Sequence, residues 1–166
     1  MAGPADATLA RLTARVAKKL CRQGHLMVTA ESCTGGFLAK TLTDRPGSSD
    51  CYDRGWVTYS NDAKHAELGV RLSDIRRHGA VSRTVALAMA RGALRHSKAE
   101  VAVAVTGVAG PSGGSPAKPV GTVWIAWGFR RGGRSRLVAR RFQFAGRRDA
   151  VRRRTVAEAL KGLLGP

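Results

Sequence analysis

The stretch Thr29-Ala30-Glu31-Ser32-Cys33-Thr34-Gly35-Gly36 places a serine and a cysteine beside a pair of glycines. It follows a short apolar run at 26–28 and precedes residues 37–42, whose apolar positions have helical spacing. The expected order is therefore strand, tight turn and helix start. A serine at such a junction can project its hydroxyl outward while backbone N–H groups of the turn point the same way. This arrangement permits nucleophilic catalysis by Ser32.

The same stretch has other interpretations that its local spacing leaves open. Ser32 or Thr34 can serve as the N-cap of the following helix, which is the common role of Ser and Thr at that position. Cys33 is a rival nucleophile, because a thiol is intrinsically the better one. Alternatively, Cys33 is a small buried residue at the start of the helix.

Lys64 is the candidate base, because it lies on the first turn of a helix expected over 61–68. A lysine that is partly desolvated in a pocket has a lowered pKa and can remove the proton of a serine hydroxyl. The alternative is a solvated surface lysine, and the sequence does not show whether Lys64 meets Ser32. His65 is a second candidate base, but adjacent helical positions point about a quarter-turn or more apart.

A second glycine-rich segment, 106–114, follows the all-apolar run 101–105. If the strands at 26–29 and 101–105 are neighbours, both glycine-rich turns open at the same sheet edge, where α/β proteins place ligands. Backbone donors of this segment would then face a phosphate or a developing oxyanion. The segment has neither the Walker A nor the dinucleotide-binding pattern. No His, Cys, Asp or Glu pair has metal-ligand spacing, so neither a metal nor another cofactor is expected.

Helical and strand patterns alternate along the chain. Helices are expected over 9–23, 37–44, 61–68, 72–79, 83–97 and about 151–163, and strands over 26–29, 56–59, 101–105, 121–128 and 136–144. The last two strands form a hairpin, and Asn61 and Ser82 are expected N-caps. This order predicts an α/β fold, a three-layer α/β/α sandwich with a mixed β-sheet. No repeat or linker divides the chain, so residues 1–166 are expected to form a single domain.

Composition limits the class of protein. The chain has 166 residues and 43% hydrophobic content, which exclude disorder. No apolar run approaches the length of a membrane span and no leader opens the chain, so a soluble cytoplasmic protein without membrane contact is expected. The three cysteines are an odd number without Cys-x-x-Cys spacing, which fits a reducing compartment.

The net charge is +18, and much of the excess is Arg between 130 and 154. Basic surfaces attract nucleic acid, but only 5% of the residues are aromatic, so the chain has few side chains that could serve as stacking platforms. Nucleic-acid binding is therefore possible but not favoured. Local attraction for a small phosphorylated ligand remains open.

These segments together resemble the family of the C-terminal domain of CinA, the competence/damage-inducible protein, whose members are nicotinamide mononucleotide deamidases. The resemblance covers about residues 9–164 and rests on 29–36, 47–49, Gly55, 57–61, Lys64, 79–82, 106–111, 113–114, 118–123, Phe144, Gly146, Arg148 and 151–152. Longer family proteins carry an N-terminal domain that resembles molybdopterin-binding proteins. This chain lacks that domain, so the deamidase activity alone is expected.

The resemblance implies hydrolysis of the carboxamide of nicotinamide mononucleotide to nicotinate mononucleotide and ammonia, a step of pyridine nucleotide salvage. It implies Ser32 as nucleophile, Lys64 as base and Tyr59 as a group that orients or shares the proton. It also implies a homo-oligomer. Arg148 is the expected phosphate partner, because a guanidinium fork suits phosphate oxygens. Residues expected to contact substrate are Thr34, Gly35, Gly36, Asn61, Thr106, Gly107, Ala109, Gly110 and Arg148.

Two other functions compete with the deamidase. The family name and the charge of +18 motivate a competence- or repair-linked nucleic-acid-associated protein without deamidase activity. A hydrolase that depends on Cys33 is the third hypothesis. The mutants Ser32→Ala and Cys33→Ala separate the two hydrolases, and salt-dependent DNA binding identifies the nucleic-acid protein.

Overall fold

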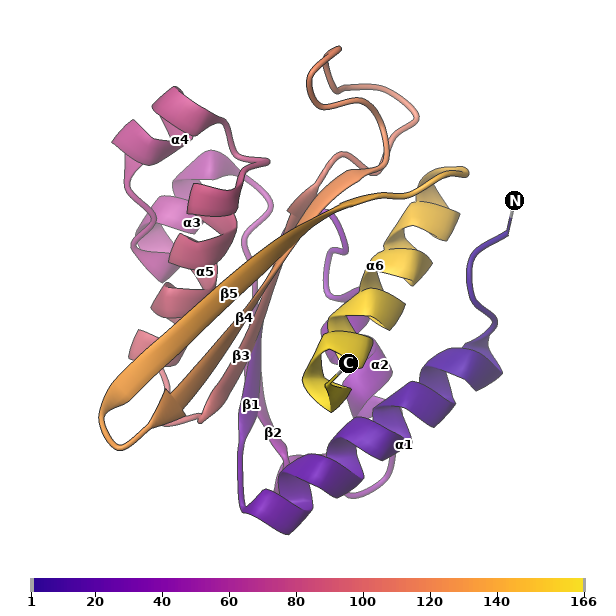
Figure 1. Cartoon of the computed structure of the whole chain (residues 1–166), viewed down its shortest axis with the longest axis vertical. Helices are drawn as coiled ribbons and strands as arrows, with labels where there is room; N and C mark the ends of the chain where they lie inside the picture. Colours follow the sequence, from indigo (N-terminus) through magenta and orange to yellow (C-terminus); the bar gives the residue numbers. More distant parts are fainter. Residues whose placement is uncertain (1, 166) are drawn as a thin grey trace.

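A five-stranded mixed β-sheet forms the middle layer of the protein in the computed structural model, which describes residues 2–165 (Figure 1). The strand order is β2-β1-β3-β4-β5. Strand β1 (Met27–Glu31) lies parallel to both β2 (Tyr52–Val57) and β3 (Val101–Gly107). Strands β4 (Thr122–Arg131) and β5 (Arg134–Gln143) continue the sheet in antiparallel pairing.

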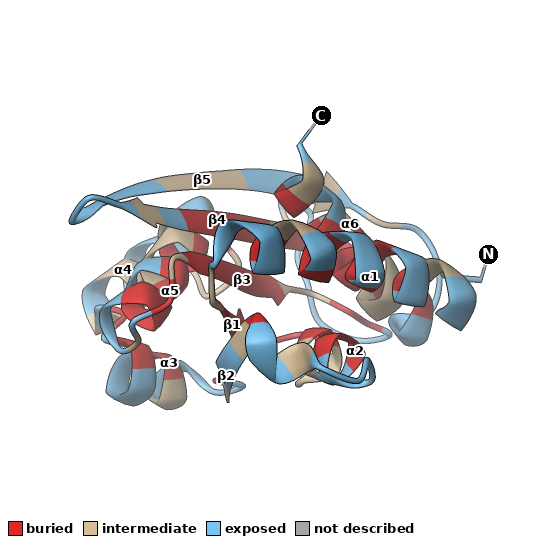
Figure 2. Ribbon diagram, turned by 90° about the horizontal axis from the view of Figure 1, so that it is seen from below, coloured by how far each residue is buried: buried red, intermediate tan, exposed pale blue. Residues whose placement is uncertain are grey.

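Helices cover both faces of the sheet (Figure 1). One layer holds α1 (Asp6–Gln23), α2 (Phe37–Thr43) and α6 (Arg148–Leu164), and the other holds α3 (Asn61–Leu68), α4 (Leu72–His78) and α5 (Arg83–Arg95). A short 3-10 helix, Ser48–Asp50, precedes β2. The expected three-layer α/β/α sandwich with a mixed sheet is confirmed. Figure 2 shows that the buried residues of these helices face the sheet and the exposed ones face outward.

Strand β3 shows why the sheet is covered twice. Val101, Val103 and Val105 pack into the core formed with α1 and α6. Ala102 and Ala104, which point to the opposite face, pack into the core formed with α5. Every residue from 101 to 106 is buried, as the all-apolar run predicts for a central strand.

Some boundaries differ from the sequence-based expectation. The strand expected at 56–59 is β2 at Tyr52–Val57. It was misplaced because β2 is an edge strand with polar, exposed residues that carry no apolar signal. Ser60, not Asn61, is the N-cap of α3, and its Oγ accepts a hydrogen bond from the Ala63 N–H at 3.0 Å. Ser82 caps α5 as expected.

Within the described part of the chain, no helix is both long and apolar enough to cross a bilayer.

Candidate active site

The candidate site lies at the edge of the sheet where β1 and β3 end. Because these two strands are parallel neighbours, the turn at 32–36 and the loop that follows Gly107 open on the same side. Ser32 is the first residue after β1, and its N–H donates to the carbonyl of Val105 on β3 at 3.0 Å. This bond fixes the start of the turn at 32–36 against the neighbouring strand.

Ser32 and Lys64 meet inside the protein. The Nζ of Lys64 donates to the Oγ of Ser32 at 3.0 Å and to the carbonyl of Thr58 at 2.8 Å. It also lies 3.4 Å from the carbonyl oxygens of Tyr59 and Ser60. Lys64 is only 1% exposed, so it is not a solvated surface lysine. The segment after β2 and the first turn of α3 thus hold the amine against the serine hydroxyl.

Burial lowers the pKa of Lys64 below its ordinary value of 10.5, because an ammonium ion loses solvation there, and the nearby Cys33 opposes this effect. Lowering the pKa makes the neutral amine available at a lower pH. A neutral amine can accept the proton of the Ser32 hydroxyl.

Cys33 has the wrong environment for a nucleophile. It is 5% exposed, and burial raises the pKa of its thiol to about 12. The Nδ1 of His65 lies 2.9 Å from the carbonyl oxygen of Val70. His65 does not line the cavity beside Ser32. The geometry therefore favours the pair of Ser32 and Lys64 over both alternatives.

A small cavity of about 210 Å³ opens above this pair. Its lining residues come from the ends of β1, β2 and β3, from the segment between α4 and α5, and from the starts of α3 and α6. They are Ser32, Cys33, Tyr59, Asn61, Lys64, Ala80, Val81, Thr106, Gly107, Ala109 and Arg148. Ala80 and Val81 were missed as site residues, although segment 79–82 was recognised as part of the motif pattern. The Thr106 hydroxyl, which donates to the Ala80 carbonyl at 2.9 Å, holds that segment in place.

Four expected substrate contacts, Thr34, Gly35, Gly36 and Gly110, lie outside this lining. Thr34 is fully buried, and its carbonyl accepts a hydrogen bond from Arg152 Nη2 at 2.7 Å. Gly35 and Gly36 have φ values of 58° and 90°, so they shape the turn through backbone conformations that favour glycine. The Gly110 carbonyl accepts a hydrogen bond from Arg148 at 2.9 Å.

Arg148, the first residue of α6, ties three segments together at the mouth of the cavity. Its Nη1 binds the Gly110 carbonyl, and its Nη2 donates to the Tyr59 hydroxyl at 2.6 Å. Tyr59 is 59% exposed, so its ring stands at the rim rather than in the core. The rim therefore presents a cation and a phenol above the Ser32 hydroxyl.

The expectation that Ser32 or Thr34 caps α2 was wrong. The N-cap is Gly36, which makes no side-chain capping bond. Instead, the buried carboxylate of Glu31 accepts hydrogen bonds from the N–H groups of Leu38 at 3.0 Å and Ala39 at 2.8 Å. A glutamate within an otherwise apolar strand was the sequence signal for this residue, which was not among the expected site residues.

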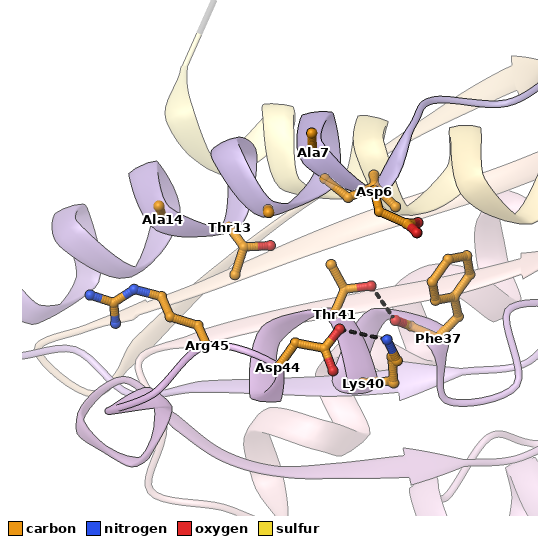
Figure 3. Close-up of a pocket in the computed structure, with 11 residues that line it drawn as sticks. Asp6, Ala7, Thr13, Ala14, Phe37, Lys40, Thr41, Asp44 and Arg45 are labelled. Carbon is orange, nitrogen blue, oxygen red and sulfur yellow. Dashed lines mark hydrogen bonds and ion pairs between the residues drawn. The ribbon is translucent and has the colours of Figure 1, made fainter.

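A separate groove of about 550 Å³ lies between α1 and α2 (Figure 3). It is lined by small and apolar residues, two threonines and four charged residues, Asp6, Lys40, Asp44 and Arg45. Lys40 and Asp44 pair with each other at 2.6 Å. Neither Ser32 nor Lys64 lines it, so it is distinct from the candidate active site. Among residues 2–165, no three His, Cys, Asp or Glu side chains are grouped so that they could hold a metal ion.

Comparison with known proteins identifies close relatives. Nicotinamide-nucleotide amidohydrolase PncC from Escherichia coli K12 is 49% identical over 158 residues, which cover 95% of this chain and 94% of the relative. The PncC protein of Pseudomonas putida is 54% identical over 92% of this chain and 93% of its own length. A CinA-like protein from Akkermansia muciniphila is 49% identical over 97% of this chain but only 37% of the longer relative.

Solved structures agree with this relationship. The competence/damage inducible protein CihA from Agrobacterium tumefaciens superposes with a TM-score of 0.91 and 44% identity, covering 99% of this chain and 97% of that one. A CinA superfamily protein from Klebsiella pneumoniae gives a TM-score of 0.88 and 41% identity, covering 93% of this chain and 94% of that one. The family model of the CinA C-terminal domain matches residues 9–165, and the chain belongs to this family.

Proposed function

We propose that this protein is a nicotinamide-nucleotide amidohydrolase that converts nicotinamide mononucleotide and water to nicotinate mononucleotide and ammonia. The named activity of the PncC relatives, which align over more than nine-tenths of both chains, supports this proposal. The structural observation that carries it is the contact of 3.0 Å between the buried Lys64 amine and the Ser32 hydroxyl.

The first half of the reaction forms an acyl-enzyme. Neutral Lys64 accepts the proton of the Ser32 hydroxyl, and the Oγ attacks the carboxamide carbon to give a tetrahedral intermediate. Lys64, now an ammonium, returns the proton to the amide nitrogen. The C–N bond then breaks, and ammonia leaves while the nicotinoyl group remains esterified to Ser32.

The second half uses water in place of the amine. Lys64 accepts a proton from a water molecule, which attacks the ester carbonyl. Collapse of this second intermediate releases nicotinate mononucleotide and returns the proton to Ser32. These steps need no metal or other cofactor.

The turn at 32–36, which we call the nucleophile turn, has backbone N–H groups that are suited to stabilise the oxyanion of both intermediates. In the part of the chain that the structure describes, the N–H groups of Cys33 and Thr34 donate to no backbone carbonyl. An N–H directly after the nucleophile is a common oxyanion donor, because it turns toward the same carbonyl that the nucleophile attacks. These two groups therefore have free hydrogen-bonding capacity beside Ser32.

Arg148 is suited to hold the phosphate of the substrate. A guanidinium has five N–H donors, and Arg148 uses two of its nitrogens on Tyr59 and Gly110. The remaining donors are available at the exposed mouth of the cavity. Tyr59, held by Arg148, lies where it can orient the substrate or share the proton.

We also propose that residues 1–166 act as one catalytic domain in a cytoplasmic homo-oligomer that does not require nucleic acid. Val57 and Tyr59 support the oligomer, because their side chains are large, apolar in part and 53% and 59% exposed. Exposed apolar side chains of this size are the kind of surface that a second copy covers. Light scattering after gel filtration measures the oligomeric state.

Ammonia release from nicotinamide mononucleotide tests the proposed function. The wild type is compared with Ser32→Ala, Lys64→Ala and Cys33→Ala, after circular dichroism has shown that each is folded. We expect loss of about 10³-fold or more in the first two variants and nearly full activity in the third. Lys40→Ala, which removes an exposed lysine, is the matched control for lost charge.

Each competing hypothesis gives a different result in the same assay. Activity that survives in Ser32→Ala and is lost in Cys33→Ala would indicate a cysteine hydrolase. A folded wild type that releases no ammonia would overturn the deamidase. DNA binding that weakens steeply with salt would then support the nucleic-acid-associated alternative.

A further inference from the structure

Glu31 is a buried carboxylate to which the proposed mechanism gives no role. It is the last residue of β1, directly before Ser32, and it is fully buried. Its backbone lies between two strands, opposite Val57 of β2 and Val105 of β3. The carbonyl of Glu31 also accepts the Thr58 N–H at 2.8 Å. The backbone at this position is therefore fixed on both sides.

The carboxylate of Glu31 reaches across the nucleophile turn to the first turn of α2. One oxygen accepts the Leu38 N–H at 3.0 Å and the other accepts the Ala39 N–H at 2.8 Å. The first N–H groups of a helix have no partner within the helix, and Gly36 at the N-cap offers no side chain to them. The carboxylate thus closes a ring from the end of β1 to the start of α2, and residues 32–37 form the span.

This span contains the groups that the proposed chemistry uses. Ser32 stands at its start, and the free N–H groups of Cys33 and Thr34 follow. Other bonds hold the same span, because the Gly35 N–H donates to the Ser32 carbonyl at 3.0 Å and Arg152 donates to the Thr34 carbonyl at 2.7 Å. Losing the bonds from the Glu31 carboxylate to Leu38 and Ala39 would loosen this span. The Ser32 hydroxyl and the Cys33 and Thr34 N–H groups could then move relative to Lys64.

We propose that Glu31 is a positioning residue of the active site, whose carboxylate sets the orientation of the Ser32 hydroxyl and of the Cys33 and Thr34 N–H groups. This inference rests on the proposed function. Glu31 does not line the cavity, and its carboxylate acts through the backbone N–H groups of Leu38 and Ala39. A misplacement of about 1 Å at a reacting centre costs roughly 100-fold in rate.

Glu31 and Lys64 bind different groups. The carboxylate of Glu31 accepts the Leu38 and Ala39 N–H groups, whereas the Lys64 amine donates to Ser32 and to the Thr58 carbonyl. Burial is the largest cause of the lowered pKa of Lys64. Removing the charge of Glu31 should therefore leave the pH profile of the reaction in place while the rate falls. A residue that tuned the base would shift the profile instead.

The variants Glu31→Gln and Glu31→Ala test this inference. Glutamine has the same shape but presents an NH₂ group to one of the two N–H donors, and alanine removes both acceptors. We expect kcat to fall about 10- to 100-fold in Glu31→Gln and further in Glu31→Ala, with the pH midpoint unchanged. In a Ser32→Ala background, the Kd for nicotinamide mononucleotide should stay within about threefold. Hydrogen exchange at the Leu38 and Ala39 amides should accelerate.

Met89→Ala is the control for lost stability. Met89 is fully buried in α5, which contributes no lining residue to the cavity. This variant should lower the melting temperature yet keep the wild-type kcat per folded molecule. All rates are therefore measured at a temperature at which circular dichroism shows every variant to be folded.

Other outcomes overturn the inference. A Glu31→Gln enzyme with the wild-type kcat would show that the turn does not need the carboxylate. A loss confined to KM and Kd, or an equal loss of kcat in Met89→Ala, would also reject the positioning role. A wild type without activity would instead reject the proposed function, so the two failures are distinguishable.

Discussion

The Nζ of Lys64 lies 3.0 Å from the Oγ of Ser32, although the two residues are 32 positions apart in the chain. Parallel pairing of β1 with β2 brings them together, because Ser32 follows β1 and Lys64 lies on α3, just beyond the end of β2. The contact is buried, and the carbonyl of Thr58 fixes the amine from its other side at 2.8 Å. The proposed base and the proposed nucleophile are thus held together by the backbone structure of the fold.

The rate of the reaction should depend on the ionisation of Lys64. Only the neutral amine can accept the serine proton, so kcat/KM should rise with pH as Lys64 loses its proton. Since burial lowers the pKa of Lys64, the midpoint should lie below 10.5. Ammonia release measured across a pH series gives this midpoint. Because the Cys33 thiol opposes this lowering, Cys33→Ala should have a midpoint no higher than that of the wild type, and a wild-type midpoint at or above 10.5 would contradict the assignment of Lys64 as base.

The stability of the protein should depend on the same ionisation. The pKa of Lys64 is lower in the folded state than in the unfolded chain, where it has its ordinary value of 10.5. Between these two values the unfolded chain binds more protons, so the free energy of unfolding rises with pH across the interval and is highest above it. Lys64→Met keeps an unbranched side chain but has no titrating group. Its free energy of unfolding should therefore lack the pH-dependent part that Lys64 contributes.

Urea denaturation at several pH values measures this effect. The difference in unfolding free energy between the wild type and Lys64→Met should change in favour of the wild type as the pH rises from about 7 to about 10. Lys40→Met removes an exposed lysine with a side chain 66% accessible, and its difference from the wild type should stay flat. A flat difference for Lys64→Met as well would show that its pKa is not lowered by folding.

The cysteines should differ in their reaction with iodoacetamide. Cys21 is exposed, whereas Cys33 and Cys51 are buried. Burial raises the pKa of the Cys33 thiol to about 12 and that of Cys51 to about 11. Because the thiolate is the reactive form, we expect labelling of Cys21 in the native protein and of all three cysteines after unfolding. Mass spectrometry identifies the labelled positions.

Activity after alkylation provides the functional part of this test. Cys21 lies on α1, outside the cavity, so its labelling should leave ammonia release unchanged. If the native protein were labelled at Cys33 and ammonia release fell at the rate of that labelling, the result would instead support Cys33 as the nucleophile. Labelling in the variant Cys21→Ser removes the interfering site.

The fold could be predicted from the sequence because its signals are local. Alternating Val and Ala in β3 indicate a strand covered on both faces, and Ser82 marks the start of α5. Strand β2 was misplaced, because an edge strand whose residues face solvent has no apolar pattern. The position of an edge depends on strand order, which is a property of the whole sheet.

The candidate site was predictable in residue type but not in geometry. Ser32 and Lys64 were named from their neighbours and from the family resemblance, yet their separation of 3.0 Å follows from the pairing of strands that are distant in sequence. Glu31 was missed as a site residue for a different reason. A glutamate at the end of a buried strand is visible in the sequence, but its partners are the backbone N–H groups of Leu38 and Ala39, which no side-chain pattern identifies.

Arg148 should control recognition of the phosphate. It lies at the exposed mouth of the cavity, where its fork already binds the Tyr59 hydroxyl at 2.6 Å and the Gly110 carbonyl at 2.9 Å. Losing a charge-assisted hydrogen bond costs about 1.5–3 kcal/mol, so Arg148→Ala should raise KM for nicotinamide mononucleotide about 10- to 100-fold. Initial rates of ammonia release over a range of substrate concentrations give KM and kcat.

Two comparisons separate phosphate binding from a general defect at this rim. Nicotinamide riboside lacks the phosphate, so its kcat/KM should be nearly the same for the wild type and Arg148→Ala. Arg147→Ala, which removes the neighbouring exposed arginine outside the cavity lining, should keep the wild-type KM for the mononucleotide. Equal losses on the mononucleotide and the riboside would show that Arg148 instead supports Tyr59 and the loop at Gly110. In that case Tyr59→Phe, which removes the hydroxyl bonded to Arg148, should reproduce the defect.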